Sequence, residues 1–363
     1  MRSSTSNSKS GSVSSPSDAR SGSRDTASPT PFRKRRLRRV SWGFIGFVAL
    51  YAALEILVFR NPDLYAVEYR SSVGQFAELA ESFRHADAQR ITAIVLGDSQ
   101  SKDALRPDLL AESSGRDAAS LFNFSISGGK AFDIYHTYLQ YADQLPNVKE
   151  AILVVNEHQI NSHDMADDLK FRYYAGFRDR LRVVDWDNYG ELGLGWVSKA
   201  FDMRAVWSKI VKSHFKGTLP KKPVTEVWKP GGLRAETQLE ENGLTAAYAQ
   251  ARADGWFKEY DLEGLQTASL EALLRDLHER GIRITILQIP RSELFEEAVR
   301  SRYPAEQQAY FAKIGELAEQ YGATFTVMSN EGLSLKEHFR DSNHVNPKGA
   351  AIVSREVAER WMT

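Results

Sequence analysis

The stretch ITAIVLGDSQSKDAL, residues 91–105, begins as a β-branched apolar run and changes abruptly at Gly97-Asp98-Ser99. An apolar run of this length is typical of a strand buried on both faces of a sheet. The serine after it would lie at the carboxyl edge of that sheet, where parallel α/β folds place their ligands. The alternative is that Asp98 or Ser99 only caps the next helix, and the stretch by itself favours the cap.

Strand and helix patterns alternate along the rest of the chain. We expect strands at 91–96, 121–126, 151–155, 282–289 and 323–327. We expect helices at 103–112, 132–142, 262–280, 305–321 and 347–361. Such alternation requires right-handed crossovers, so the sequence predicts an α/β fold with a doubly wound parallel sheet of about five strands.

The C-terminal stretch HFRDSNHVNPKG, residues 338–349, places Asp341 and His344 just before a helix that Pro347 can begin. A serine hydroxyl becomes a good nucleophile when an imidazole accepts its proton, and a carboxylate orients that imidazole. An Asp and a His at this spacing are common on surfaces and carry little weight alone. Together with the strand-terminal serine, they predict the catalytic residues Ser99, His344 and Asp341.

Two further strand ends carry residues that could stabilise an oxyanion. Gly128 follows the second strand in LFNFSISGGKAFD, residues 121–133, and Asn156 ends the third strand in EAILVVNEHQ, residues 150–159. A glycine lets its backbone N–H approach a developing negative charge, and an amide side chain can donate to it. We therefore expect an oxyanion hole of the Ser99 and Gly128 N–H groups and the Asn156 amide. A plain turn and a strand-ending cap are the alternatives.

These blocks together resemble the SGNH, or GDSL-type, superfamily of hydrolases and acyltransferases. In chain order the similar blocks are Gly97-Asp98-Ser99, Gly128 within SISGG, Asn156, and Asp341 with His344. The third block departs from the usual G-x-N-D, since this chain has Val154-Val155-Asn156-Glu157. The resemblance implies an SGNH-like fold over residues 91–363 and acyl-serine chemistry without a cofactor.

The N-terminal part predicts a membrane anchor. Residues 1–39 are rich in Ser, Gly, Pro and Thr and carry ten of the 47 basic residues and two of the 47 acidic ones, so we expect a disordered cytoplasmic tail. The apolar run at 40–59 is long enough for one transmembrane helix, with Glu55 close enough to its outer end to reach the headgroups. A cleaved signal peptide is disfavoured by the long leader and the lack of an A-x-A site. A buried core helix is the other alternative.

Two more regions follow from the pattern. Residues 60–90 are expected to form a stalk that ends in an amphipathic helix, with Phe76, Leu79 and Phe83 on one face. Residues 158–260 are too long for an ordinary connection and are expected to be an insertion in the catalytic domain. Its aromatic residues could stack on sugars, form the insertion's own core or rest on a membrane interface. They include Tyr173, Tyr174, Trp186, Tyr189, Trp196, Trp207, Trp228 and Trp256.

Composition excludes several classes of function. The chain has equal numbers of basic and acidic residues and no cysteine, so we expect no nucleic-acid partner, disulfide or thiolate site. His158 and His163 with Asp164 match no common metal-ligand spacing, and we expect no metal.

The membrane anchor and the resemblance together suggest a role at the bacterial cell surface. The chain is similar to alginate O-acetyltransferase accessory proteins and to the D-alanyl transfer protein of teichoic acid assembly. This similarity implies an O-acyltransferase that modifies a surface or exported polysaccharide. The expected partners are a glycan acceptor and a membrane-embedded acyl donor, and the expected location is the inner membrane with an exported catalytic domain. An O-acetyl esterase and a non-catalytic polymer-binding scaffold are the alternatives.

Overall fold

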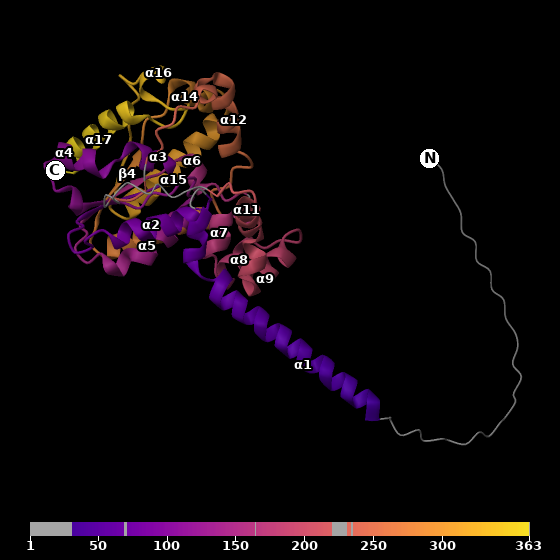
Figure 1. Cartoon of the computed structure of the whole chain (residues 1–363). Helices are drawn as coiled ribbons and strands as arrows, with labels where there is room; N and C mark the ends of the chain where they lie inside the picture. Colours follow the sequence, from indigo (N-terminus) through magenta and orange to yellow (C-terminus); the bar gives the residue numbers. More distant parts are fainter. Residues whose placement is uncertain (1–30, 69–70, 164, 220–230, 234, 363) are drawn as a thin grey trace, which may run out of the picture. The chain divides into compact units, whose positions relative to one another are not determined.

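The computed structural model describes residues 31–68, 71–163, 165–219, 231–233 and 235–362. The chain forms two units, Met1–Ala52 and Ala53–Thr363. Most of the tail that we expected to be disordered, residues 1–30, lies outside the described residues. Its last part instead belongs to helix α1, Pro31–Leu54 (Figure 1).

The apolar segment of the N-terminal region is helical, as predicted. Among the described residues, one helical stretch, Trp42–Phe59, is long and apolar enough to cross a membrane. It comprises the end of α1 and a short π-helix, η1, Glu55–Phe59, which belongs to the second unit. Glu55 is buried against protein in that unit, so its carboxylate does not reach outward as the sequence suggested.

The second unit is built around a parallel sheet of five strands, which confirms the predicted fold class. The strands are β1, Ala93–Leu96; β2, Leu121–Asn123; β3, Glu150–Val154; β4, Arg283–Gln288; and β5, Thr324–Val327. Their order is β2-β1-β3-β4-β5, and every neighbouring pair is parallel. The chain therefore reverses its direction of winding at β1, and the carboxyl ends of β1, β2 and β3 meet at one edge.

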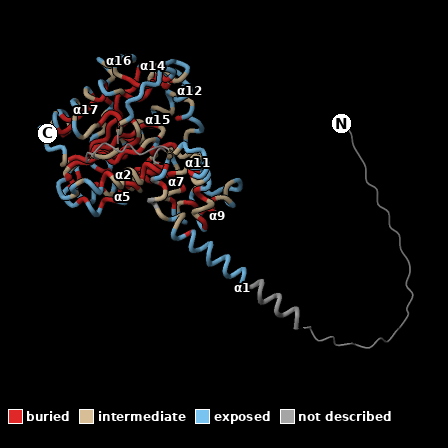
Figure 2. Tube along the Cα trace, in the orientation of Figure 1, coloured by how far each residue is buried: buried red, intermediate tan, exposed pale blue. Residues whose placement is uncertain are grey.

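Helices cover both faces of the sheet, because successive strand residues point to opposite sides. Ile94 and Leu96 face one core and Ala93 and Val95 the other. The first core contains α2, Gly74–Arg84; α5, Ala131–Tyr141; α13, Leu265–Glu279; and α15, Pro304–Gln320. The second contains α4, Pro107–Ser114, and α17, Pro347–Trp361. Figure 2 shows the buried backbone concentrated in the middle of this unit.

Helix α2 corrects the expected stalk. Phe76, Leu79 and Phe83 share one face as predicted, but that face is buried against the strands. Phe83 contacts the rings of Phe122 and Phe124 from the second strand and its continuation. Residues 74–84 are therefore part of the domain core, because three large apolar side chains on one face gain more from burial than from exposure on a stalk.

The segment 158–260, expected to be an insertion, is largely helical where it is described. Its helices are α6, Glu157–Ile160; α7, Leu169–Tyr174; α8, Phe177–Val183; α9, Tyr189–Val197; α10, Lys199–Asp202; α11, Arg204–Phe215; and α12, Ala246–Trp256. Helix α12 packs on α14, Glu293–Arg302, through Ala249, Ala253, Phe295 and Val299. This contact brings the end of the insertion back over the carboxyl edge of the sheet.

Candidate active site

The turn after β1 holds Ser99 at the edge of the sheet. Gly97 has φ +156°, and a Cβ there would lie 2.3 Å from Ser101 Oγ, so only glycine fits this position. Asp98 caps helix α3, Ser99–Ala104, by accepting a hydrogen bond from Gln100 N at 2.9 Å. Ser99 is thus the first residue of the helix. The cap and the nucleophile, which the sequence offered as alternatives, are two adjacent residues.

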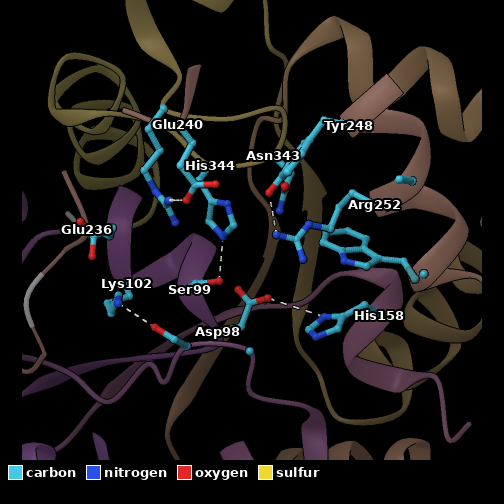
Figure 3. Close-up of a pocket in the computed structure, with 16 residues that line it drawn as sticks. Asp98, Ser99, Lys102, His158, Glu236, Glu240, Tyr248, Arg252, Asn343 and His344 are labelled. Carbon is cyan, nitrogen blue, oxygen red and sulfur yellow. Dashed lines mark hydrogen bonds and ion pairs between the residues drawn. The ribbon is translucent and has the colours of Figure 1, made fainter. Parts of the chain in front are cut away.

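The structure brings the three expected catalytic side chains together. Ser99 Oγ lies 2.8 Å from His344 Nε2 (Figure 3). His344 Nδ1 in turn lies 2.9 Å from both carboxylate oxygens of Asp341. The backbone N–H groups of Asn343 and His344 also donate to Asp341 Oδ1, each at 2.9 Å. The loop therefore wraps its own carboxylate, which fixes the orientation of the imidazole. This arrangement has the order and the hydrogen-bond geometry of a Ser-His-Asp triad.

The electrostatics of the loop favour an ionised Asp341. Burial opposes the charge, but the hydrogen bond and charge of His344, the Asn343 N–H and Arg340 together lower the pKa of Asp341. Arg340 also donates to Asp103 Oδ2 at 2.8 Å and to Glu240 Oε1 at 2.7 Å. It therefore ties the histidine loop to α3 and to the segment before α12.

Gly128 also lies where the sequence predicted, in the wall of the same pocket as Ser99. It has φ +62°, a left-handed conformation that glycine adopts without strain. Its neighbour Ser127 is held from both sides by Gln75 on α2, which accepts from Ser127 N at 2.7 Å and donates to Ser127 O at 3.1 Å. The helix expected to be a stalk thus positions the glycine loop.

Asn156 is not directed at the pocket, which corrects the expected oxyanion hole. Its side chain is fully buried, and its amide nitrogen donates to Asp98 Oδ2 at 2.9 Å and to Gln100 Oε1 at 3.0 Å. Both amide hydrogens are therefore used inside the protein. Asn156 instead braces the turn that carries Ser99.

A second histidine lies in the pocket wall. His158 stacks on Trp256, and its Nδ1 lies 2.9 Å from Asn156 Oδ1. Burial, together with the nearby Lys130, Lys170 and Arg252, lowers the pKa of His158 well below its usual range. Because Asn156 Oδ1 can only accept, the neutral ring carries its proton on Nδ1, which leaves Nε2 as an acceptor.

Helix α12 closes the pocket with residues that the sequence analysis did not identify as site residues. Tyr248, Arg252 and Trp256 recur every four residues and line the pocket on one face of this helix (Figure 3). The pocket has a volume of about 740 Å³. The i, i+4, i+8 spacing was readable in the sequence, but nothing local indicated that this helix faces Ser99. Further polar lining residues are Lys102, Glu236, Glu240, Arg340 and Asn343.

The aromatic residues of segment 158–260 occupy different environments in the structure. Trp256 lines the pocket, whereas Tyr173, Tyr174 and Trp207 pack against the core. Trp186, Tyr189 and Trp196 are exposed, and Trp228 lies outside the described residues. Within the described part of the chain, no cluster of three or more His, Asp or Glu side chains could hold a metal ion. Asp164, considered with His158 and His163, is outside that part.

The fold and the site define an α/β protein with a Ser-His-Asp arrangement at the carboxyl edge of a parallel sheet. In comparisons with family models and with curated proteins, no family and no curated relative matches this chain.

Proposed function

We propose that the protein is a serine-dependent O-acyltransferase, with acetyl as the simplest acyl group, that acts on a surface or exported polysaccharide. One observation carries the proposal: an unbroken hydrogen-bond chain runs from Ser99 through His344 to the buried Asp341, in the wall of a pocket of about 740 Å³. Such a chain raises the nucleophilicity of a serine.

In the first half-reaction, Ser99 Oγ attacks the carbonyl carbon of the donor ester while His344 Nε2 accepts the hydroxyl proton. The negative oxygen of the tetrahedral intermediate accepts hydrogen bonds from the Ser99 and Gly128 backbone N–H groups. The ester C–O bond then breaks, and His344 returns the proton to the departing alcohol. Acyl-Ser99 remains.

In the second half-reaction, a hydroxyl of the acceptor glycan attacks acyl-Ser99 and gives its proton to His344. Asp341 stabilises the imidazolium that forms, and collapse of the intermediate returns the proton to Ser99 Oγ. The acylated glycan leaves. Water in place of the glycan would give an esterase, because the two reactions share the same intermediate.

The lining of the pocket supports a carbohydrate acceptor. Glu240, Tyr248, Arg252 and Asn343 present charged, hydroxyl and amide groups that suit a polyhydroxylated ligand. Trp256 is 7% exposed and stacks with His158, so it offers no open stacking platform.

Anchoring favours transfer over hydrolysis. The segment Trp42–Phe59 could hold the protein in the inner membrane, with the N-terminus cytoplasmic and the catalytic domain exported. A tethered enzyme can take acyl groups from a membrane-embedded donor protein and pass them to an emerging glycan. A free esterase gains less from a tether.

The nucleophile is tested with a fluorophosphonate label and an activated acetyl ester. We expect Ser99→Ala to lose both labelling and ester cleavage, because the Ser99 hydroxyl is the one that lies 2.8 Å from His344 Nε2. Ser101→Ala is the matched control, since Ser101 Oγ is buried within hydrogen-bonding distance of Asp98 O and Ser125 Oγ. Labelling that survives in Ser99→Ala, or is lost only in Ser101→Ala, would remove Ser99 from the proposal and favour a scaffold or another nucleophile.

The same protein then separates transfer from hydrolysis. Full-length protein in detergent is given an acetyl donor ester and a series of oligosaccharides, and free acetate and acetylated sugar are measured together. We expect acetylated sugar to increase with acceptor concentration while acetate falls. Acetate release that no acceptor diminishes, together with deacetylation of an acetylated glycan, would replace the transferase by the esterase.

A further inference from the structure

Helices α8 and α9 expose a large apolar surface, which we call the α8–α9 face. Its members, all exposed, are Phe177, Leu181, Val184, Trp186, Tyr189, Leu194, Trp196 and Val197. Trp186 is 91% exposed, and the Phe177 and Trp196 rings touch with centroids 5.0 Å apart. The Trp186 and Tyr189 rings also lie close together, with centroids 6.3 Å apart. Clustered large apolar side chains on a surface mark an interaction site.

The frame beneath the α8–α9 face is rigid. Arg180 is buried and donates to both carboxylate oxygens of Asp202, at 3.2 and 2.6 Å. It also donates to the carbonyl oxygens of Arg172 and Leu192, which joins α7, α8, α9 and α10. Six members of the face therefore lie on helices that these buried hydrogen bonds join, whereas Val184 and Trp186 lie in the turn between α8 and α9.

The α8–α9 face is attached to the end of the apolar segment Trp42–Phe59. The Glu55 carboxylate accepts hydrogen bonds from Lys199 N, from Ala200 N at 3.2 Å and from Ser198 Oγ at 3.2 Å, at the start of α10. Arg60 donates to the carbonyl oxygen of Val197, a member of the face, at 3.3 Å. All of these contacts lie within the second unit. The face therefore begins where the apolar segment ends.

We propose that the α8–α9 face lies in the headgroup region of the membrane that Trp42–Phe59 enters. The inference rests on the anchoring part of the proposed function and is independent of the chemistry at Ser99. Tryptophan and tyrosine favour this interface because their rings are apolar at one end and polar at the other. Contact with lipid would remove most of the exposed apolar surface from water.

A small cavity beside the face fits the same occupant. It has a volume of about 410 Å³ and is bordered by Phe59, Tyr65 and Trp196 on its apolar side. Three cationic residues also line it, Arg60, Arg180 and Lys199, while the acidic groups next to them are Glu55 and Asp202. The excess of one positive charge suits a lipid phosphate.

Membrane contact would also orient the domain. Helices α8 and α9 lie at one end of the second unit, away from α12, α14 and α16, Leu335–His338 (Figure 1). Because α12 borders the Ser99 pocket, the pocket would be set back from the bilayer. A water-borne glycan could then reach it.

The absence of cysteine allows a direct test. Single variants Leu181→Cys and Leu194→Cys in the face, Val48→Cys in the apolar segment and Ile352→Cys on α17 are labelled with a fluorophore in the full chain. Each is placed in phospholipid nanodiscs that contain nitroxide lipids. Because interfacial groups lie ~5–10 Å deep, we expect labels at 181 and 194 to lose more than about half of their fluorescence and the label at 352 to lose little.

The outcomes distinguish the inference from the anchoring. Quenching at 48 with no more quenching at 181 and 194 than at 352 would overturn the docking surface and leave the anchor intact. A blue shift of the fluorophore emission at 181 and 194 without quenching by the nitroxide lipids would overturn the membrane contact in favour of a protein occupant. If that blue shift increased with protein concentration, the occupant would be a second copy of this chain. Lack of quenching at 48 would overturn both the anchor and the docking surface.

Discussion

Asp98, the residue before Ser99, carries a carboxylate that is almost completely buried. Burial raises its pKa above the usual range, although the hydrogen bonds from the Asn156 amide and from Gln100 N and the charge of His344 act in the opposite direction. Its side chain both caps α3 and lies 3.7 Å from His158. The position of the Ser99 turn therefore depends on a small buried polar network, and Asn156 is the member that joins Asp98 to Gln100.

Replacing Asn156 tests this bracing role. We expect Asn156→Ala to lower the free energy of unfolding by about 1–3 kcal/mol, because it leaves buried acceptors without a donor, and to slow ester cleavage by displacing Asp98. Urea unfolding and turnover are measured side by side, with the exposed Asn147→Ala as control. A large loss of rate at unchanged stability would instead support the oxyanion role expected from the sequence.

Asp133, on α5 near the glycine loop, gives the protein a pH-dependent stability. Burial and the charge of Asp168 raise the pKa of Asp133 to about 7, against the opposing charges of Lys170 and Lys130. The folded protein thus holds a proton that the unfolded chain releases near pH 4. The contribution of Asp133 to the free energy of unfolding therefore falls as the pH rises from about 4 to about 7, and it stays constant above about pH 7.

Asp133→Asn keeps the acceptor for Lys130 N and removes the charge. We expect this variant to be more stable than the native protein at pH 8 and to lose that advantage at pH 4, because the native carboxyl is protonated there in both states. Thermal unfolding across this range measures the difference. The exposed Asp187→Asn is the control, and a parallel shift of both variants at every pH would contradict the expectation.

At the scale of elements, α12 adds a wall to the open pocket at the carboxyl edge of the sheet. Thr245 caps it by accepting from Tyr248 N at 3.2 Å, and its apolar residues pack on α14. The opposite face carries Tyr248 and Arg252, whose side chains are hydrogen-bonded at 2.8 Å. The helix therefore presents a preformed polar surface to whatever binds beside Ser99.

Arg252 should contribute to acceptor binding. We expect Arg252→Ala to raise KM for an oligosaccharide acceptor by roughly tenfold, the effect of losing about 1.4 kcal/mol of binding, with a smaller change in kcat. Gln250→Ala, exposed on the same helix and outside the pocket, is the control. An unchanged KM for every acceptor would remove α12 from the binding surface.

At the scale of the whole molecule, the Glu55 carboxylate links the end of the apolar segment to the helical insertion through hydrogen bonds. A carboxylate near the end of an apolar run is costly unless it is paired, and here it meets three donors at the start of α10 together with Arg60. These bonds connect residues more than 140 positions apart. Within the second unit, they connect the end of the apolar segment to the start of α10.

Removing the Glu55 carboxylate should weaken the attachment of the apolar segment to α10. We expect Glu55→Ala to speed amide hydrogen exchange in residues 189–202, because the first N–H groups of α10 lose their acceptor, while exchange in α17 is unchanged. The exposed Glu359→Ala on α17 is the matched control. Equal protection of residues 189–202 in both variants would show that other contacts hold the insertion in place.

Local patterns in the sequence were enough to predict the class of fold and the strands of the sheet. Each strand is an apolar run that depends on its own residues, and the polar residue after it must lie at the carboxyl edge once the sheet is parallel. That logic placed Ser99 and Gly128 at one pocket, and the Ser-His-Asp pattern added His344, with Asp341 buried next to it. It needed no knowledge of side-chain direction.

The tertiary structure alone decided the direction and burial of several side chains, because these depend on contacts with residues far away in the sequence. The direction of the Asn156 amide is set by Asp98 and Gln100, and the burial of α2 by the strands beneath it. Arg252 reaches the pocket because α12 packs on α14, and Glu55 is buried because α10 offers it donors. The free energy of such contacts belongs to pairs of residues dozens of positions apart, for which a local pattern carries no signal.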